Sequence, residues 1–460
     1  MNPRGRPLSP VEREFFEKFF RRLADSQVVS VLLRNYENFP AEMGNDLDVF
    51  FRRADLQKAV RIFRETLRES GGEWLHVHER DYVLAVWFRA GRDAPSAIHL
   101  DFYHGAFTWH GLAYLNDDEL LAASRPWQQF KIPRPAHEAA NLFLTSLLWG
   151  GFFKARYHEQ IRTLLAAPEE KAEFERIVGR RFGAANRPAF IFVGEQNPTD
   201  KEMRRYAGRL RRAFRLCSFR RNPFVAAFRM SRYWLKELAD VFSPPGIHIA
   251  VMGPDGSGKS TVIDALKIRI GSYFGETVDG HWRPSVLPDI GVLFGKREKS
   301  TGPATDPHGQ PPHSPVTSAL RFFYYWLDYW IGYPLRVWKP KAKNHLVIFD
   351  RYAPDMWCDA RRYRLKLPSG LLKCFCRLVP QPDQTFILVA DAETIHARKA
   401  ELPLDTLREL TRRYAEAAKI FPRVQLVDCS RPANEVADEI TAGVLNHLKA
   451  RSRRHRLFRG

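Results

Sequence analysis

One eight-residue segment constrains the fold of this 460-residue chain more than any other. It runs from Gly253 to Ser260 with the sequence GPDGSGKS, between an apolar run, His248–Met252, and a helical stretch, Ser260–Ile270. Glycines at these spacings let successive backbone amides point inward at phosphate oxygens, and the following helix adds the positive end of its dipole. A strand, a glycine-rich loop and a helix in this order predict a nucleoside-triphosphate site.

The residue types of this loop suit a triphosphate and its metal. Lys259 is expected to place its charge between the β- and γ-phosphates, and the hydroxyl of Ser260 is expected to bind Mg²⁺. ATP and Mg are therefore the predicted cofactors. The residues predicted to bind ATP are Gly253, Asp255, Gly256, Ser257, Gly258, Lys259, Ser260 and Thr261.

Three further apolar runs follow the loop: Leu346–Phe349, Thr385–Ala390 and Val424–Val427. Because they alternate with helical stretches, they predict a parallel sheet covered by helices on both faces. The first run delivers Asp350 and Arg351 at its carboxyl end, where ligands bind in open α/β sheets. Asp350 is therefore a second candidate Mg²⁺ ligand or acceptor base, and the Arg351 guanidinium is suited to an acceptor phosphate.

The N-terminal part of the chain carries paired carboxylates on an expected strand. Asp46 and Asp48 lie two residues apart at the start of the run 47–51, so they share one face of the expected strand. Asp101 lies on a later apolar run, Ala97–Phe102. Three convergent carboxylates could hold the two Mg²⁺ ions of a nucleotidyl transfer. The alternatives are a domain that only binds a ligand and a pair of solvated surface aspartates.

The pattern of apolar and charged residues predicts an α/β protein. It divides the chain into three domains and a tail. Residues 1–135 are expected to form a small α+β sheet domain of strand–strand–helix–strand–strand order. Residues 136–243 are expected to be a basic, mostly helical connecting domain, and residues 244–450 the parallel-sheet domain. The basic tail, 451–460, is most simply a disordered end.

The chain carries 72 Lys and Arg against 52 Asp and Glu, a formal net charge of +20. This excess predicts an anionic partner without choosing among nucleotides, glycans, nucleic acid and membranes. The segment Arg204–Arg232 interleaves arginines with aromatic residues, which fits a solvated helix face, or contact with a membrane surface or a polyanion. The tail 451–460 carries the same alternatives. No motif predicts sequence-specific nucleic-acid binding, and the oligomeric state stays open.

Five scattered cysteines are too few for a disulfide framework, which favours a reduced, cytoplasmic compartment. A cytoplasmic protein could also associate peripherally with the inner face of the membrane. The apolar stretches Ala139–Phe153 and Ser318–Trp338 are short or interrupted by charges, measured against the roughly 20 apolar residues of a span. Both are expected to be buried helices.

Over about 245–445 the sequence resembles the thymidylate kinase family of nucleoside monophosphate kinases. One departure is that Trp-Arg-Pro stands where the family has Arg-Glu-Pro, and another is a short segment after Arg398 with few cations. The matching segments, in chain order, are GPDGSGKST at 253–261, His281–Pro284, Asp350–Tyr352, Pro382-Asp383 with the strand and helix that follow, Arg413-Tyr414 and Val427-Asp428.

This resemblance implies an ATP- and Mg-dependent kinase that contains a P-loop. It implies that Asp255, Arg283 and Arg351 bind the acceptor, and that Arg398 or Lys399 closes over the transition state. The aromatic block Phe322–Trp330 and the run Asp355–Arg364 more nearly resemble divergent thymidylate-kinase-like proteins associated with bacterial surface polysaccharides. The expected acceptor is therefore a nucleoside monophosphate such as dTMP or a sugar of a surface glycan.

Residues 25–135 resemble, more weakly, the nucleotidyltransferase superfamily that includes DNA polymerase β. The resemblance rests on Asp46, Asp48 and Asp101, and the family's upstream Gly-Ser pair is replaced by Leu33-Arg34-Asn35-Tyr36. Two alternatives to a kinase follow from the chain as a whole. One is a nucleotidyltransferase whose glycine loop only senses NTP, and the other is a non-enzymatic, NTP-dependent module that binds a membrane or polyanion.

Overall fold

The computed structural model describes residues 6–458, except 93, 95–96, 152–154, 184–198, 289, 291–307 and 454. Its contacts divide the chain into two compact units. Unit 1 comprises residues 1–236 and 448–460, and unit 2 comprises residues 237–447. The helices of 136–236, which patterning assigns to a connecting domain, thus share a unit with the N-terminal sheet.

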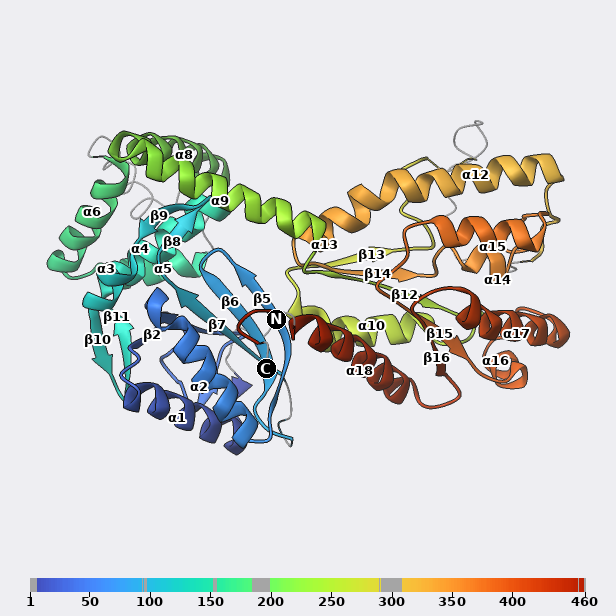
Figure 1. The fold of residues 1–460 in the computed structure, drawn as a ribbon, viewed down its shortest axis with the longest axis horizontal. Helices are drawn as coiled ribbons and strands as arrows, with labels where there is room; N and C mark the ends of the chain where they lie inside the picture. The colour runs from blue at the N-terminus through green and yellow to red at the C-terminus, as the bar shows by residue number, and fades with distance from the viewer. Residues whose placement is uncertain are drawn as a thin grey trace. The chain divides into compact units, whose positions relative to one another are not determined.

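Unit 1 is built on a mixed five-stranded sheet of order β2-β4-β7-β6-β5 (Figure 1). β4 and β7 run parallel, and the other neighbours are antiparallel. The structure adds β5 to the predicted strand order. The strands are β2 (Ser30–Leu32), β4 (Leu47–Phe51), β5 (Glu73–Arg80), β6 (Val83–Arg89) and β7 (Ile98–His104).

Two helices pack on this sheet through phenylalanines at helical spacing. They are α1 (Pro10–Asp25) and α2 (Leu56–Glu69). Phe15 and Phe19 of α1 contact Phe63 of α2, each with ring centroids 5.9 Å apart, and Phe63 contacts Phe102 of β7 at 5.5 Å. These rings form one of the two cores of unit 1. Ser9 caps α1, and Glu12 completes the capping box.

The second core of unit 1 joins strand residues to the helices of 135–236. α8 (Asp200–Arg221) buries Met203, Ala207, Leu210 and Phe214, which recur every three or four residues and so share one face. The other helices are α3 (Asp117–Ala122), α4 (Pro135–Thr145), α5 (Ala155–Leu164), α6 (Pro168–Phe182) and α9 (Pro223–Phe242). The short strand pairs are β1 (Arg6–Pro7) with β3 (Glu42–Met43), β8 (Phe107–Trp109) with β9 (Leu112–Leu115), and β10 (Ser124–Trp127) with β11 (Phe130–Pro133).

The chain returns to unit 1 at the end of α18 (Ala433–Ser452). The hydroxyl of Ser452 accepts a hydrogen bond of 3.0 Å from the amide of Val77. Phe458 is buried in the core of unit 1, with its ring 5.5 Å from that of Trp74. The expectation of a disordered tail is therefore wrong for its described residues, because an aromatic side chain anchors the basic segment.

Unit 2 contains a five-stranded sheet, all parallel, of order β13-β14-β12-β15-β16. A parallel sheet in this part of the chain is confirmed. Three strands after the loop follow the predicted apolar runs, and the structure adds the exposed edge strand β13. The strands are β12 (Ile247–Met252), β13 (Thr277–Gly280), β14 (Leu346–Asp350), β15 (Gln384–Val389) and β16 (Val424–Asp428).

The strand order of unit 2 reverses beside β12. From β12 the chain builds the half with β13 and β14, and then crosses to build the half with β15 and β16. Ligands bind outside the carboxyl ends of strands at such a reversal. Figure 1 shows α10 (Lys259–Ile270) and α12 (Pro315–Gly332) on opposite sides of the sheet. The remaining helices are α13 (Lys339–Ala342), α14 (Asp355–Cys358), α15 (Ser369–Leu378), α16 (Ala392–Arg398) and α17 (Leu404–Ile420).

Residues 139–150 and 318–338 of the two apolar stretches are helical, and each segment ends in a π-helical turn, while residues 152 and 153 lie outside the described part of the chain. The stretch 318–338 is only half buried, which corrects the expectation of a buried helix. Phe322, Tyr325 and Tyr329 of α12 are buried, whereas Leu320 and Phe323 are exposed. Among the described residues, no helix is both long enough and apolar enough to cross a bilayer.

Candidate functional site

The glycine loop joins the end of β12 to the start of α10. Gly253, Gly256 and Gly258 have φ of 145°, 87° and 86°, a region that favours glycine. A Cβ on Gly253 would lie 2.7 Å from the carbonyl oxygen of Leu388, and one on Gly256 would lie 3.0 Å from the Cβ of Lys399. The loop therefore needs glycine both for its backbone angles and for its close approach to neighbouring segments.

Lys259 is buried at the first position of α10. Its ammonium donates to the carbonyl oxygens of Gly253 (3.1 Å) and Pro254 (2.8 Å), and lies 3.7 Å from a carboxylate oxygen of Asp255. Burial, and then the charge of Arg351, lower the pKa of Lys259 to about 8, although Asp255 opposes the shift. An anion in the loop would stabilise the charged form.

Asp350 ends β14, the strand next to β12, and lies opposite Val251. Its Oδ1 is buried and has no hydrogen-bond partner among the described residues, and the same holds for the hydroxyl of Ser257. Buried polar atoms without partners are rare in folded proteins. A carboxylate and a hydroxyl are oxygen ligands of the kind that Mg²⁺ takes, so these residues fit the predicted ion.

The serine predicted as a metal ligand lies in the first turn of α10. Ser260 is exposed, and so is Thr261. The structure thus leaves the hydroxyl of Ser260 accessible at the helix N-terminus beside the glycine loop.

Arg351 follows Asp350 and ties the end of β14 to the glycine loop. Its side chain is buried, and its Nη1 donates to both carboxylate oxygens of Asp355, each at 3.0 Å. Its Nη2 donates to Asp255 at 2.5 Å. The hydroxyls of Tyr414 (2.5 Å) and Tyr363 (2.7 Å) also donate to Asp355. Burial lowers the pKa of Arg351, but Asp355, Tyr414 and Asp255 together outweigh it and raise that pKa well above its usual value.

A second arginine, Arg362, also bonds to Asp255. Burial would raise the pKa of Asp255, but Arg351, Lys259 and Arg362 together lower it below its usual range. Three cations therefore lie around one loop carboxylate, and an anionic ligand could compete with that carboxylate for them. Motif reasoning did not assign a role to Arg362, although the run Asp355–Arg364 was the sequence signal for it.

The other predicted cations differ in where they lie. Lys399 lies against the loop at Gly256, and its ammonium pairs with Glu401 at 2.9 Å. Arg398 donates to the carbonyl oxygens of Cys429 (2.6 Å) and Ser430 (3.0 Å). In this conformation Arg398 therefore holds the segment after β16.

Arg283, predicted to bind the acceptor, is buried in an ion pair with Asp328 of α12, 3.0 Å apart. It also donates to the carbonyl oxygen of Leu287 at 3.0 Å. Its neighbour Trp282 packs against Tyr325 and Tyr363, with ring centroids 4.7 and 5.0 Å away. Trp282 thus connects the aromatic block to Tyr363, whose hydroxyl donates to Asp355.

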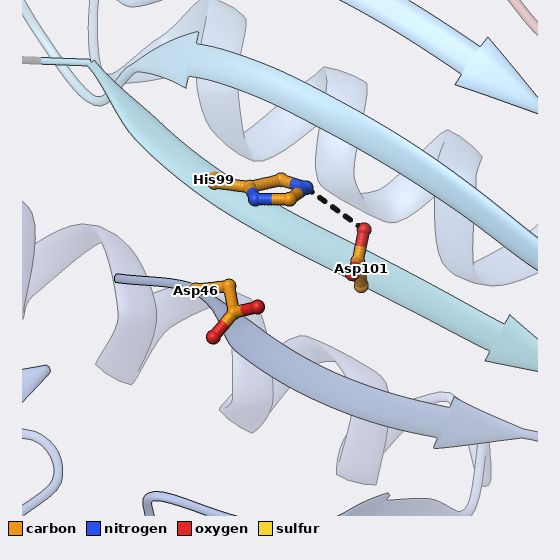
Figure 2. Close-up of side chains that lie close together, drawn as sticks. All are labelled: Asp46, His99 and Asp101. Carbon is orange, nitrogen blue, oxygen red and sulfur yellow. Dashed lines mark hydrogen bonds and ion pairs between the residues drawn. The ribbon is translucent and has the colours of Figure 1, made fainter. Parts of the chain in front are cut away.

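Unit 1 contains a separate cluster of potential metal ligands. One ligand atom each of Asp46, His99 and Asp101 lie within 4.8 Å of one another. Figure 2 shows His99 and Asp101 on β7, with Asp46 facing them from the segment before β4. The imidazole Nε2 lies 2.9 Å from Asp101, and the ring stacks on Trp87 at 4.1 Å. Burial lowers the pKa of His99, but Asp101, Asp46 and Asp48 together outweigh it and raise that pKa.

Asp48 is not part of that cluster. It is buried and bonded to Arg34, and its Oδ1 has no hydrogen-bond partner among the described residues. Burial raises the pKa of Asp48 to about 6, although Arg34 opposes the shift. Of the predicted trio, Asp46 and Asp101 thus lie together with His99, whereas Asp48 pairs with Arg34.

A scan of family models and a search of curated proteins find no match to this chain. The resemblances to kinases and nucleotidyltransferases therefore depend on the motifs and geometry described above.

Proposed function

We propose that unit 2 is an ATP- and Mg-dependent phosphotransferase of the thymidylate kinase type. The observation that carries the proposal is the buried Lys259 inside a glycine loop, beside a buried oxygen of Asp350 that has no partner among the described residues. Both lie at the carboxyl ends of neighbouring parallel strands, where the strand order reverses. A triphosphate with its metal would supply the charges that this arrangement lacks.

In this proposal the loop amides and Lys259 bind the β- and γ-phosphates, and Asp350 and Ser260 hold Mg²⁺. The bound metal would neutralise charge that develops on the phosphate oxygens. An acceptor oxygen forms a bond to the γ-phosphorus as the bond to the β–γ bridging oxygen breaks, and ADP leaves. A phosphate acceptor brings no proton, whereas the proton of a sugar hydroxyl would pass to Asp350.

On the acceptor side, Arg351 and Arg362 are the cations nearest the loop carboxylate. An acceptor phosphate would compete with Asp255 for these two guanidinium groups. The aromatic side chains of Trp282 and Tyr363 offer a surface for a base or a sugar ring. The acceptor is therefore proposed to be a nucleoside monophosphate or a glycan sugar, and Lys399 a cation that acts in the transition state.

An acceptor screen with γ-labelled ATP and Mg²⁺ tests the proposal on the full chain. The panel contains dTMP, other nucleoside monophosphates, and free and phosphorylated sugars. Lys259→Ala is expected to lower transfer by a factor of about 10³ or more, the scale of charge stabilisation in such sites. Lys267→Ala is the matched control, because Lys267 lies on the same helix and pairs with Asp264 and Asp279 at the surface. Equal transfer by the parent and Lys259→Ala proteins would refute the proposal.

Nucleotidyl transfer by unit 1 remains the rival function. It predicts incorporation of α-label and release of pyrophosphate, both abolished by Asp46→Asn with Asp101→Asn and unaffected by Lys259→Ala. The Arg34–Asp48 pair disfavours it, because one of the three expected carboxylates already has a cation. Binding of ATP without turnover over any acceptor would instead favour the non-enzymatic module.

A further inference from the structure

Helix α8 and the part of α9 that precedes Glu237 lie at the surface of unit 1 (Figure 1). On α8 the residues opposite the buried face are Arg205, Arg209, Arg212, Leu216 and Phe219, all exposed. On α9 the inner face carries Ala226, Met230 and Tyr233, while Phe224, Phe228 and Leu235 lie on the outer face. Spacings of three and four residues keep each set on one side of its helix.

The outer face of α9 is apolar and uncovered. Phe224 is 86% exposed, Phe228 62% and Leu235 64%. Large side chains exposed together on one helix face mark an interaction surface, whereas single exposed apolar residues do not. Trp234, at the border of this face, is also exposed.

The same segment is strongly cationic. No aspartate or glutamate occurs between Met203 and Lys236. No carboxylate among the described residues forms an ion pair with a cation of this segment. The cations are Arg204, Arg205, Arg209, Arg211, Arg212, Arg215, Arg220, Arg221, Arg229, Arg232 and Lys236.

Unit 1 fixes which side of α9 faces outward. The backbone of α9 approaches the β8–β9 turn so closely that a Cβ on Gly111 would lie 2.3 Å from the carbonyl oxygen of Arg229. The rings of His110 and Tyr233 lie 5.2 Å apart, and Lys236 donates to the carbonyl oxygen of Glu79. The apolar face is therefore held outward by contacts on the opposite face.

We infer that the outer face of α9, with the arginines of α8 and α9, docks on a bilayer that contains anionic lipid. A helix with Phe, Leu and Trp on one face and arginines beside it suits insertion along the interface, since no described helix crosses a membrane. Two copies of this surface would repel each other through their uncompensated charge. A nucleic acid would neutralise the arginines but leave Phe224 and Leu235 in water.

Charge distinguishes this surface from the exposed apolar face of α12 in unit 2. Val316, Leu320 and Phe323 are 72%, 68% and 54% exposed. α12 has Arg321 and Asp328 as its charged residues and no run of cations. It therefore lacks the attraction to anionic lipid that the docking proposal requires, and serves as a matched control.

Vesicle flotation of the full chain tests the docking surface. The protein is expected to float with phosphatidylcholine vesicles that contain phosphatidylglycerol, not with pure phosphatidylcholine vesicles, and to be released by salt. Phe224→Ser with Phe228→Ser and Leu235→Ser is expected to lower the partition coefficient about tenfold or more. Arg229→Gln and Arg232→Gln are each expected to lower it about fivefold.

The control variant, Val316→Ser with Leu320→Ser and Phe323→Ser, should float as the parent does. Thermal unfolding of each variant verifies that the substituted proteins are folded. Equal flotation with neutral vesicles, or flotation unchanged by the α9 substitutions, would overturn the proposal. A dimer that dissociates on substitution of the α9 residues would also overturn it. The same holds if the parent protein binds single-stranded RNA but neither kind of vesicle.

Discussion

The ammonium of Lys259 is buried away from water near the charge of Arg351, and both effects make its proton easier to lose. A pKa near 8 means that a substantial fraction of the free protein has a neutral Lys259 at mildly alkaline pH. Phosphate oxygens favour the charged form, so that binding of a triphosphate above this pH should be coupled to proton uptake.

We therefore expect the affinity for a non-hydrolysable Mg–ATP analogue to fall as pH rises above about 8, by up to about tenfold per pH unit. The sign follows from the free protein, which must take up a proton to recover the charge that the ligand requires. Titration calorimetry in buffers of different ionisation enthalpy measures the uptake. Lys259→Met should bind weakly without this pH dependence, and the same slope in that variant would contradict the assignment.

At Asp48 a buried carboxylate depends on a single cation. Removing Arg34 leaves that charge without its partner, so Arg34→Met is expected to cost about 3–5 kcal/mol of the free energy of unfolding at neutral pH. The double variant Arg34→Met with Asp48→Asn should recover part of this loss. Denaturant unfolding measures both. Arg34 lowers the pKa of Asp48, which is about 6 in the parent, so that pKa is higher in Arg34→Met. The loss should therefore shrink as pH falls toward 6 and become constant below it.

At the scale of elements, α4 contains a carboxyl group that titrates near neutrality. Glu138 is buried and accepts hydrogen bonds from Tyr36 (2.8 Å) and Gln160 (3.0 Å). Burial raises the pKa of Glu138 to about 7, and Glu37 adds to the shift. Its pKa is thus higher in the folded chain than in the unfolded chain. The stability that it contributes is fully present below about pH 4.5 and is lost as pH rises through 7.

Glu138→Gln removes this titration and keeps the side-chain shape. Relative to the parent, its free energy of unfolding is expected to improve between about pH 4.5 and 7, by up to about 1.4 kcal/mol per pH unit. Denaturant titrations at several pH values measure the difference. Glu175→Gln, on a helix that belongs to the same unit, provides a comparison. A difference between Glu138→Gln and the parent that does not vary with pH would contradict the assignment.

How much of the fold could be predicted differs between elements. β12, β14 and β15 are continuous apolar runs buried on both faces, so that sequence alone places them to within one or two residues. β13, Thr277–Gly280, is a short edge strand without an apolar run, so the sequence pattern does not predict it. The aromatic residues of 322–330 suggest that α12 is buried, yet only one side of this helix is buried in the structure.

The candidate site shows the same division. The loop and Asp350 could be predicted because their chemistry depends on residues close together in sequence. The bond between Arg362 and Asp255 joins residues 107 positions apart. The bond between Arg34 and Asp48 occupies a carboxylate that the motif assigns to a metal. Whether a carboxylate is open to a metal depends on such partners, which only the folded chain brings together.

On the scale of the whole molecule, the units are discontinuous in sequence. Phe458, which follows unit 2 in the chain, completes the core of unit 1. Phe458→Ala is expected to cost unit 1 about 3–5 kcal/mol, the usual loss for a buried phenylalanine. Hydrogen exchange should report the loss in β5 and β6 while the sheet of unit 2 keeps its protection. Arg456→Ala, at an exposed arginine, should change stability by about 0.5 kcal/mol or less.

The return of the chain at residues 448–458 also sets the order in which the protein can be completed during synthesis. Every strand of unit 2 leaves the ribosome before Phe458 does. The parallel sheet of unit 2 can therefore fold while Trp74 of unit 1 still lacks its contact with Phe458. The first part of the polypeptide to be translated is in this sense the last whose core can be completed.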